Sequence, residues 1–549
     1  MGLKQILPIK NYFLFILSLI VGVSVGYASF ISGESLNSFI FLMILILVGI
    51  SAVRSLKLSF CLFLFVLPMS DILQINVFFP VRIEYFFFLF LFLSVLYNFD
   101  NKSDKISLIN IIRSPMDFAF ALFMFVIVIS VFQSTYIPPN PPILLSRFVN
   151  YPWVKSISKI VLLLVCLVLF YITQYVVNSK EKLKYYLSGY SFFVCIFAFY
   201  GLCSLLLYML SGHLISLDGQ ASLVDMPNDI PRIVGTEEEP VFFGFYLMTI
   251  LPLLLSFLFA SYFSRDKPEF YNNKLLFIIT LIITAALIGT GSRSVILALI
   301  ISSITILILF KEERSIIQYS KDILHNIYAG AGNLFALRTV KVIGMLFLIC
   351  IGLYVGLYMD VIKTKYANEV YPNIKDNIEK LIVTPIVGTF DSSYGKFWST
   401  RTRLITSEYA VDLFKQHPWL GVGYENYRFY SGNKVYHGLM RTTNVRWPEV
   451  NNYPLKVLAE LGIIGFLLFI FLAFSFFYYL VSALRKTTDL FLKTVLRGYI
   501  ACFVGISVIL FFSSTITRSY LWVCIGLAVA AIKIAEPKYS SSKEKIFKI

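Results

Sequence analysis

The chain has 549 residues, of which 58% are hydrophobic and only 14% charged, and its formal net charge is +16. A soluble domain has about 45–50% apolar and about 25% charged residues, so this composition indicates many membrane spans rather than one large soluble core. The positive residues lie in short loops between apolar runs, a pattern that reports membrane topology and excludes nucleic acid as a partner.

Apolar runs long enough for membrane-spanning helices recur along the chain, since a span needs about twenty residues. They predict an all-α fold: a polytopic transmembrane helix bundle of about 12–14 spans with a large helical loop on the outer face of the membrane. The predicted spans are residues 12–30, 37–53, 58–70, 81–98, 117–133, 157–177, 187–211, 241–262, 274–289, 294–310, 340–359, 454–481, 498–513 and 517–534.

Lysine and arginine are concentrated in alternate short loops, for example at 180–184 and 485–497. Because basic residues are retained in cytoplasmic loops, this bias predicts a multi-pass protein with both termini in the cytoplasm. Three regions follow. Residues 1–359 hold eleven spans and an outer loop at 212–240, residues 360–453 form a periplasmic loop domain, and residues 454–549 hold three spans and a cytoplasmic tail.

Metal and cofactor signals are missing from the sequence. All seven cysteines lie inside apolar runs, and the four histidines are scattered without metal-ligand spacing, so we expect no metal site. No glycine-rich phosphate loop follows a strand, which argues against a nucleotide-driven pump. We therefore expect no cofactor.

The most informative stretch runs from Arg401 to Gly465. Apolar residues at helical spacing predict an amphipathic helix that ends at His417. Gly421 and Gly423 then permit a tight turn that a Cβ would obstruct. The stretch holds cationic side chains beside a membrane surface, where an anionic lipid headgroup could bind.

The run R-x(10)-F-K-x-H-P-x-x-G-V-G-x-x-N, here Arg403 to Asn426, resembles the periplasmic-loop signature of the O-antigen ligase and O-antigen polymerase superfamily. In that family a His-Asn pair follows, and then a pattern like L-x-x-L-x-E-x-G-x-x-G, which residues 455–465 fit. Asn452 matches the Asn of the pair, but Asn451 occupies the position of the family histidine.

Two shorter matches lie upstream, at Arg232-x-x-Gly235 with Glu239, and at Thr290-Gly-Ser-Arg293. The resemblance implies glycosyl transfer at the periplasmic side of a bacterial inner membrane. It implies a polyprenyl-diphosphate-linked glycan as donor, a second such glycan as acceptor, membrane lipid around the site, and a chain-length regulator protein as a partner.

Arg232, Arg293 and Arg403 are the candidates for binding the donor diphosphate. Arginine suits this role because its planar, permanently charged fork holds phosphate oxygens at two points. Arg293 lies between two apolar runs, where a charge is costly unless it is paired or faces a cavity. The alternatives are snorkelling for Arg293, a solvated helix face for Arg403, and a local ion pair with the acids at 237–239 for Arg232.

The family resemblance also bears on the general base. In the ligase branch, the histidine of the His-Asn pair is the proposed base, which would take a proton from the acceptor hydroxyl. An amide does not titrate near neutral pH, so we expect Asn451 and Asn452 to orient a hydroxyl or phosphate instead. Glu239 and Glu449 are then the candidate bases.

The predicted enzyme is a polymerase that joins polyprenyl-diphosphate-linked repeat units into a cell-surface polysaccharide, an O-antigen or exopolysaccharide, by metal-independent glycosyl transfer. The missing histidine favours this over a ligase that transfers the glycan to lipid A core or to protein. A flippase of the same lipid-linked sugars is the alternative from another class. The charges gather at the outer lip rather than at the midplane, which favours chemistry over transport.

Overall fold

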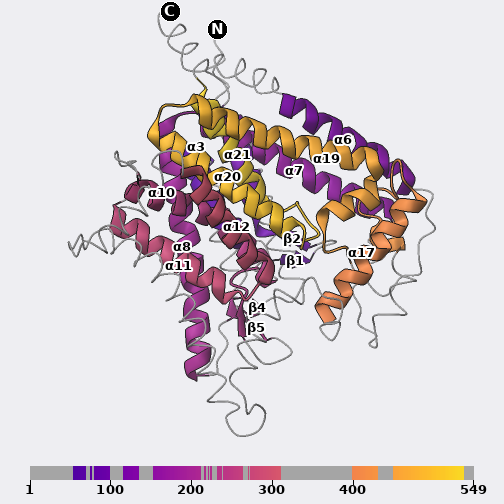
Figure 1. The fold of residues 1–549 in the computed structure, drawn as a ribbon, viewed down its shortest axis with the longest axis horizontal. Helices are drawn as coiled ribbons and strands as arrows, with labels where there is room; N and C mark the ends of the chain where they lie inside the picture. Colours follow the sequence, from indigo (N-terminus) through magenta and orange to yellow (C-terminus); the bar gives the residue numbers. More distant parts are fainter. Residues whose placement is uncertain are drawn as a thin grey trace, which may run out of the picture.

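The computed structural model describes residues 53–69, 74–76, 80–98, 115–134, 152–211, 216–217, 220–221, 223–225, 231–237, 239–263, 270, 272–310, 398–430 and 449–536. These residues are mostly helical (Figure 1). The helices are α3 (Leu56–Val66), α4 (Ile83–Asn98), α6 (Pro115–Ser134), α7 (Pro152–Val176), α8 (Lys180–Ser211), α9 (Pro240–Met248), α10 (Leu251–Phe263), α11 (Asn273–Gly289), α12 (Arg293–Phe310), α17 (Trp398–Gln416), α19 (Tyr453–Lys486), α20 (Leu490–Leu510) and α21 (Ser519–Ala535), with a 3-10 turn, η2, at Leu67–Met69.

Short antiparallel hairpins account for the strands in the described part of the chain. Strand β1 (Gln74–Asn76) pairs with β2 (Pro80–Arg82), β3 (Ser216–Leu217) with β4 (Gln220–Ala221), and β5 (Leu223–Asp225) with β6 (Pro231–Ile233). The last two hairpins lie in the predicted outer loop, and β6 leads toward α9.

The all-α polytopic class is confirmed. Six helical segments of the described chain are long and apolar enough to cross a membrane: Pro152–Val176, Lys180–Tyr208, Pro240–Ser261, Arg293–Phe310, Tyr453–Lys486 and Leu490–Leu510. Five shorter apolar helices accompany them. Together they match eleven of the predicted spans; the spans predicted at 12–30, 37–53 and 340–359 lie outside the described residues apart from Val53.

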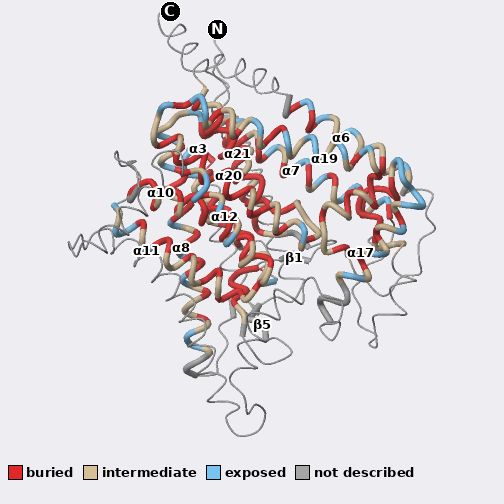
Figure 2. The backbone as a smooth tube through the Cα atoms, in the orientation of Figure 1, coloured by how far each residue is buried: buried red, intermediate tan, exposed pale blue. Residues whose placement is uncertain are grey.

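Helices α20 and α21 lie at the centre of the bundle. Helix α20 packs against α10, α12 and α19, α21 packs against α7, and α19 lies along α6 (Figure 1). A small residue permits the close contact between α12 and α20, because a Cβ on Gly505 would meet Ser302 Oγ at 2.3 Å. Buried residues of these helices, red in Figure 2, form one large apolar cluster and a smaller one between α10, α12 and α20.

Two ends of the bundle can be told apart by their contacts. At one end Lys180, at the start of α8, is ion-paired with Asp489, just before α20. Both belong to loops that the sequence predicts on the same side of the membrane. At the other end lie β6, the α11–α12 turn, α17, and the starts of α19 and α21. We call this end the site face.

The predicted amphipathic helix is α17, which ends at Gln416, one residue before the predicted end. It packs against the first part of α19. The described part of the predicted loop domain is residues 398–430, which include α17, and residues 449–453, since 360–397 and 431–448 lie outside the described residues.

Candidate functional site

The turn that follows α17 is hydrogen-bonded to a break in α19. The backbone N–H of Val422 donates to the carbonyl of Ala459 at 3.0 Å, and that of Gly423 to the carbonyl of Glu460 at 2.8 Å. In return the N–H of Ile463 donates to the carbonyl of Pro418 at 2.8 Å. We call residues 417–427 and 459–464 the clasp.

Two glycines make the clasp sterically feasible. Gly462 has φ 63° and ψ −164°, which interrupts the helical hydrogen bonding of α19. A Cβ there would lie 2.4 Å from the carbonyl carbon of Trp419. Gly421 has φ 65°, and a Cβ on it would lie 2.3 Å from the carbonyl carbon of Glu460. Both positions combine a left-handed backbone with a close backbone approach, which only glycine accommodates without strain.

Two polar side chains complete the clasp. The Glu460 carboxylate accepts the backbone N–H groups of Glu425 at 2.9 Å and Tyr427 at 3.2 Å. The Asn426 amide donates to the carbonyl of Val422 at 3.1 Å. The motif residues Gly421, Gly423, Asn426, Glu460 and Gly462 therefore join the turn after α17 to the break in α19. Their role is to hold the backbone of the site.

Membrane helices hold the clasp from the other side. Ser156 Oγ of α7 donates to the carbonyl of Tyr424 at 2.6 Å and contacts Asn426 Oδ1 at 3.3 Å. Ser130 Oγ of α6 accepts the N–H of Tyr424 at 3.1 Å. The turn after α17 is thus fixed to three helices of the bundle: α6, α7 and α19.

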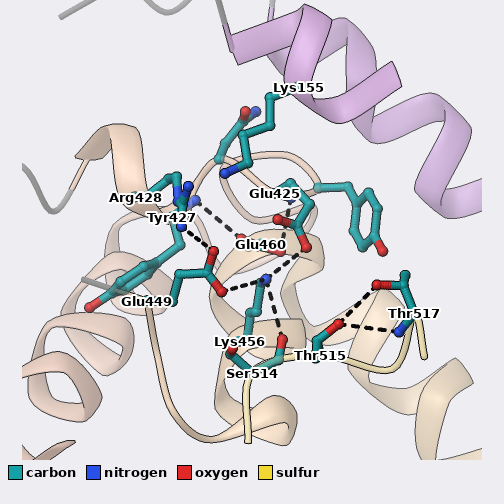
Figure 3. Close-up of polar contacts among 12 residues, drawn as sticks. Lys155, Glu425, Tyr427, Arg428, Glu449, Lys456, Glu460, Ser514, Thr515 and Thr517 are labelled. Atoms are coloured by element: carbon teal, nitrogen blue, oxygen red, sulfur yellow. Dashed lines mark hydrogen bonds and ion pairs between the residues drawn. The ribbon is translucent and has the colours of Figure 1, made fainter. Parts of the chain in front are cut away.

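A charge network lies beside the clasp (Figure 3). The Lys456 ammonium, with its side chain 4% exposed, bonds to Glu425 Oε1 at 2.7 Å and lies 3.8 Å from Glu449 Oε2. It also donates to the carbonyl of Ser514 at 3.4 Å. Glu449 is ion-paired in addition with Arg428. We call Glu425, Arg428, Glu449 and Lys456 the charge network.

The network fixes the charge of its carboxylates. Burial alone would raise the pKa of Glu449, but the Lys456 and Arg428 cations outweigh burial and hold it far below its usual range. Burial also acts to raise the pKa of Glu425, but the Lys456 cation outweighs it, so the pKa of Glu425 is lowered. Both groups therefore stay ionised near neutral pH and accept protons poorly.

Glu425 has an unusual backbone in addition. Its φ of 63° is the one positive φ of a non-glycine residue within the described ranges. Such a conformation costs about 1–3 kcal/mol and persists only where the surroundings enforce it. Here the Lys456 ion pair and the Glu460 hydrogen bond both act on this residue.

The predicted arginines meet at a separate part of the site face. Arg293 is the first residue of α12, after a turn in which Gly291 has φ 55°. Arg232, on β6, donates from Nε to the carbonyl of Thr290 at 2.8 Å. Two segments that are about sixty residues apart are thereby placed side by side.

Arg403 reaches this place from α17. Burial, and then the charge of Arg293, lower the pKa of the Arg403 guanidinium, while Glu239 acts in the opposite direction. The guanidinium carbon lies 5.8 Å from the centre of the Phe512 ring. Two predicted diphosphate ligands and one predicted base are thus within electrostatic reach of one another.

Glu239 occupies the N-cap position of α9 in an extended conformation, and its side chain makes no capping hydrogen bond. Glu237, two residues earlier, forms a buried ion pair of 2.8 Å with Arg518. The Arg518 guanidinium also lies 3.9 Å from the Phe242 ring centre. The acids near position 237 therefore have different surroundings: Glu237 pairs with Arg518, and Glu239 acts on Arg403.

The predicted amide pair lies at the start of α19. Asn452 is its N-cap, and its side-chain oxygen accepts the N–H of Leu455 at 3.1 Å. Asn451 is half-buried between this cap and Glu449 of the charge network. The structure thus divides the seven predicted residues between two clusters: Arg232, Glu239, Arg293 and Arg403 in one, Glu449, Asn451 and Asn452 in the other.

Sequence reasoning missed several polar residues of the site face. Lys456 lies inside a predicted span, and a charge in such a position is a signal of function or pairing. Arg518 is likewise a charged residue inside a predicted span, which also indicates function or pairing. Among the described residues, no group of His, Cys, Asp or Glu has the arrangement of a metal site.

Comparison with known proteins yields one family. A family model described as O-antigen ligase matches residues 278–470, a range that includes Arg293, Arg403 and both halves of the clasp. No curated protein matches the chain. This segment of a polytopic, all-α membrane protein therefore matches the O-antigen ligase and polymerase superfamily, whose members are glycosyltransferase-like enzymes.

Proposed function

We propose that the protein is a polymerase that joins polyprenyl-diphosphate-linked repeat units at its site face, on the periplasmic side of a bacterial inner membrane. The observation that supports the proposal is that Arg293, at the start of α12, acts on Arg403 of α17: burial, and then the charge of Arg293, lower the pKa of the Arg403 guanidinium.

Two guanidinium groups repel each other, and holding both in a partly buried place costs free energy that a bound anion would offset. A diphosphate supplies several negative charges, and paired arginines hold its oxygens in a fixed orientation. Arg232, on β6, donates a hydrogen bond to the carbonyl of Thr290 and so holds the turn that precedes Arg293.

In the proposed reaction, a hydroxyl oxygen of the acceptor glycan forms a bond to the anomeric carbon of the donor sugar. The bond from that carbon to the diphosphate oxygen breaks, and the lipid diphosphate leaves with the bond electrons. Arg293 and Arg403 compensate the charge that develops on this leaving group. A single displacement inverts the anomeric configuration.

The proton of the acceptor hydroxyl needs a base, and the surroundings favour Glu239 over Glu449. Glu449 is held ionised by Arg428 and Lys456, and its depressed pKa makes it a poor proton acceptor. Glu239 acts electrostatically on Arg403, which supports a place for it within reach of the proposed leaving group. Once the diphosphate compensates the arginines, the Glu239 carboxylate is better able to accept a proton.

The polymerase branch is favoured by Asn451. The ligase branch of the family uses a histidine at this position as its proposed base, whereas an amide orients a hydroxyl through hydrogen bonds and does not take its proton. Asn452 supports Asn451 indirectly, because its capping bond fixes the start of α19.

Purified protein in lipid nanodiscs, supplied with a lipid-linked repeat unit, tests the proposal. A polymerase gives a ladder of products at repeat-unit spacing on a gel. One transfer to an added lipid A core would instead make the protein a ligase, and no new product with intact, folded protein would refute glycosyl transfer.

A further inference from the structure

The charge network has a neighbour that the proposed function does not use. Lys155, in the first turn of α7, is 8% exposed. Its side chain extends from α7 toward Glu425 and Arg428 (Figure 3). Within the part of the chain that the structure describes, its ammonium has no hydrogen bond and no ion pair.

The charged side chains that face Lys155 do not accept hydrogen bonds from its amine. Arg428 and Lys159 oppose its positive charge, whereas Glu425 and Glu449 attract it from a distance. Both carboxylates are already committed: Glu425 to Lys456, and Glu449 to Arg428 and Lys456. Lys155 therefore has amine N–H donors that no acceptor among the described residues satisfies.

A buried amine whose donors lack acceptors is expensive, and an ionisable residue at such a depth is by default a candidate for function. Arg428 and Lys159 repel a cation at this place, and the carboxylates of Glu425 and Glu449 are already ion-paired. The complementary ligand group is therefore an acid, which accepts the hydrogen bonds of the amine and stabilises its protonated form.

The geometry points to Lys155 as a binding site for an acidic group, a carboxylate or a phosphate, on the glycan that this protein handles. The inference rests on the proposed function for the identity of the ligand as a glycan. It adds that the substrate is an acidic saccharide, and it locates the recognition of that acid at the start of α7, apart from the arginine pair.

Binding measurements on the purified full-length protein in nanodiscs test the assignment. The probes are tri-galacturonic acid, galactose 6-phosphate and neutral galactotriose, and the difference between the first two identifies the acid. We expect both or one of the acidic probes to bind more tightly than galactotriose. Lys155→Met should weaken that binding about 10- to 100-fold, the loss expected for one charge-assisted hydrogen bond.

Two further variants separate charge from other roles. Lys155→Arg supplies a cation and should retain most of the binding. Lys415→Met is the control and should bind as wild type, because the Lys415 side chain is 70% exposed on α17 and does not face Lys155. If Lys155→Arg loses as much as Lys155→Met, or if Lys155→Met binds like wild type, the assignment is refuted. Equal binding of acidic and neutral probes by wild type refutes it as well.

Thermal unfolding supplies a readout that needs no ligand. A buried lysine whose acceptor is a ligand lowers the stability of the ligand-free protein. Lys155→Met should therefore unfold at the same temperature as wild type or higher. A fall of several degrees would show that Lys155 is a structural partner of Glu425 and Glu449, which also contradicts the assignment.

Arg293→Ala distinguishes this inference from the proposed function. It should weaken binding of a polyprenyl diphosphate and leave binding of the acidic probe unchanged. If Lys155→Met loses binding of the acidic probe while wild type does not bind a polyprenyl diphosphate, the acid site at Lys155 is supported and the proposed donor is refuted. If wild type binds the diphosphate while Lys155→Met binds the acidic probe as wild type does, the donor stands and the acid site at Lys155 is refuted.

Discussion

Replacement of Arg403 by alanine is the most direct perturbation of the arginine pair. The side chain leaves α17 with its guanidinium near Phe512 and within the field of Arg293 and Glu239. Alanine is compatible with the helix, so the backbone of α17 should not change. The variant therefore removes one cation from the proposed diphosphate site and little else.

The expected size of the effect follows from these contacts. A charge-assisted hydrogen bond to the diphosphate contributes about 1.5–3 kcal/mol, which corresponds to a loss of about ten- to a hundredfold in turnover. The contact with Phe512 contributes about 0.5–1 kcal/mol to stability. Relief of the repulsion from Arg293 acts against that loss, so the unfolding temperature should change little.

The assay is product formation from a lipid-linked repeat unit by protein in nanodiscs, with the amount of folded protein held equal. Lys415→Ala is the matched control, because Lys415 lies on the same helix with 70% of its side chain exposed. Arg403→Lys should rescue activity only in part, since lysine lacks the planar fork. Wild-type turnover in Arg403→Ala would refute the role of this residue in diphosphate binding.

Three other variants test the remaining parts of the site. Gly462→Ala should destabilise the protein by about 1–3 kcal/mol, because its Cβ meets the Trp419 backbone, whereas Gly189→Ala, with open space around it, should not; equal melting temperatures would contradict the clasp. Asn451→Ala should reduce turnover through the loss of an orienting amide, and Asn451→His should not create ligase activity; full activity in Asn451→Ala would count against the polymerase mechanism. The pKa of Glu449 lies below its ordinary value of 4.5, so its ion pairs stabilise the fold above that pH and are lost as the pH falls toward the folded pKa. In a urea titration at several pH values, Glu449→Gln should therefore show a smaller loss of stability on acidification than wild type, and parallel curves would refute the predicted linkage.

The sequence predicted the membrane helices well because each depends on a local property. An apolar run of sufficient length identifies a span wherever it packs, and the eleven spans that fall in described residues all correspond to helices. The N-cap of α19 depends on a similarly local feature, an amide just before an apolar run, although the sequence predicted an orienting role for Asn452 and not a capping one.

The contacts within the site are long-range, and the sequence gives no direct sign of them. Glu237 and Arg518 form a buried pair although 281 positions separate them. Gly421 and Gly462 were recognised as motif glycines, but their common purpose depends on two backbones that approach each other. The sequence likewise does not show that Lys456 and Arg428 lower the pKa of Glu449, a predicted base, against the effect of burial.

The clasp has a consequence for how accurately Arg403 can be placed. Fourteen residues of helix separate Arg403 from His417, a length of about 21 Å at 1.5 Å per residue. Helix α17 is therefore an arm fixed at one end, and a rotation of about five degrees at the clasp would displace the guanidinium by about 2 Å, enough to spoil a catalytic geometry. Two tyrosines reduce this freedom: Tyr427 donates to the carbonyl of Thr406 at 2.7 Å, and Tyr409 to the carbonyl of Tyr430 at 2.8 Å. The position of the Arg403 guanidinium therefore depends on the rigidity of α17 as well as on the presence of an arginine at this position.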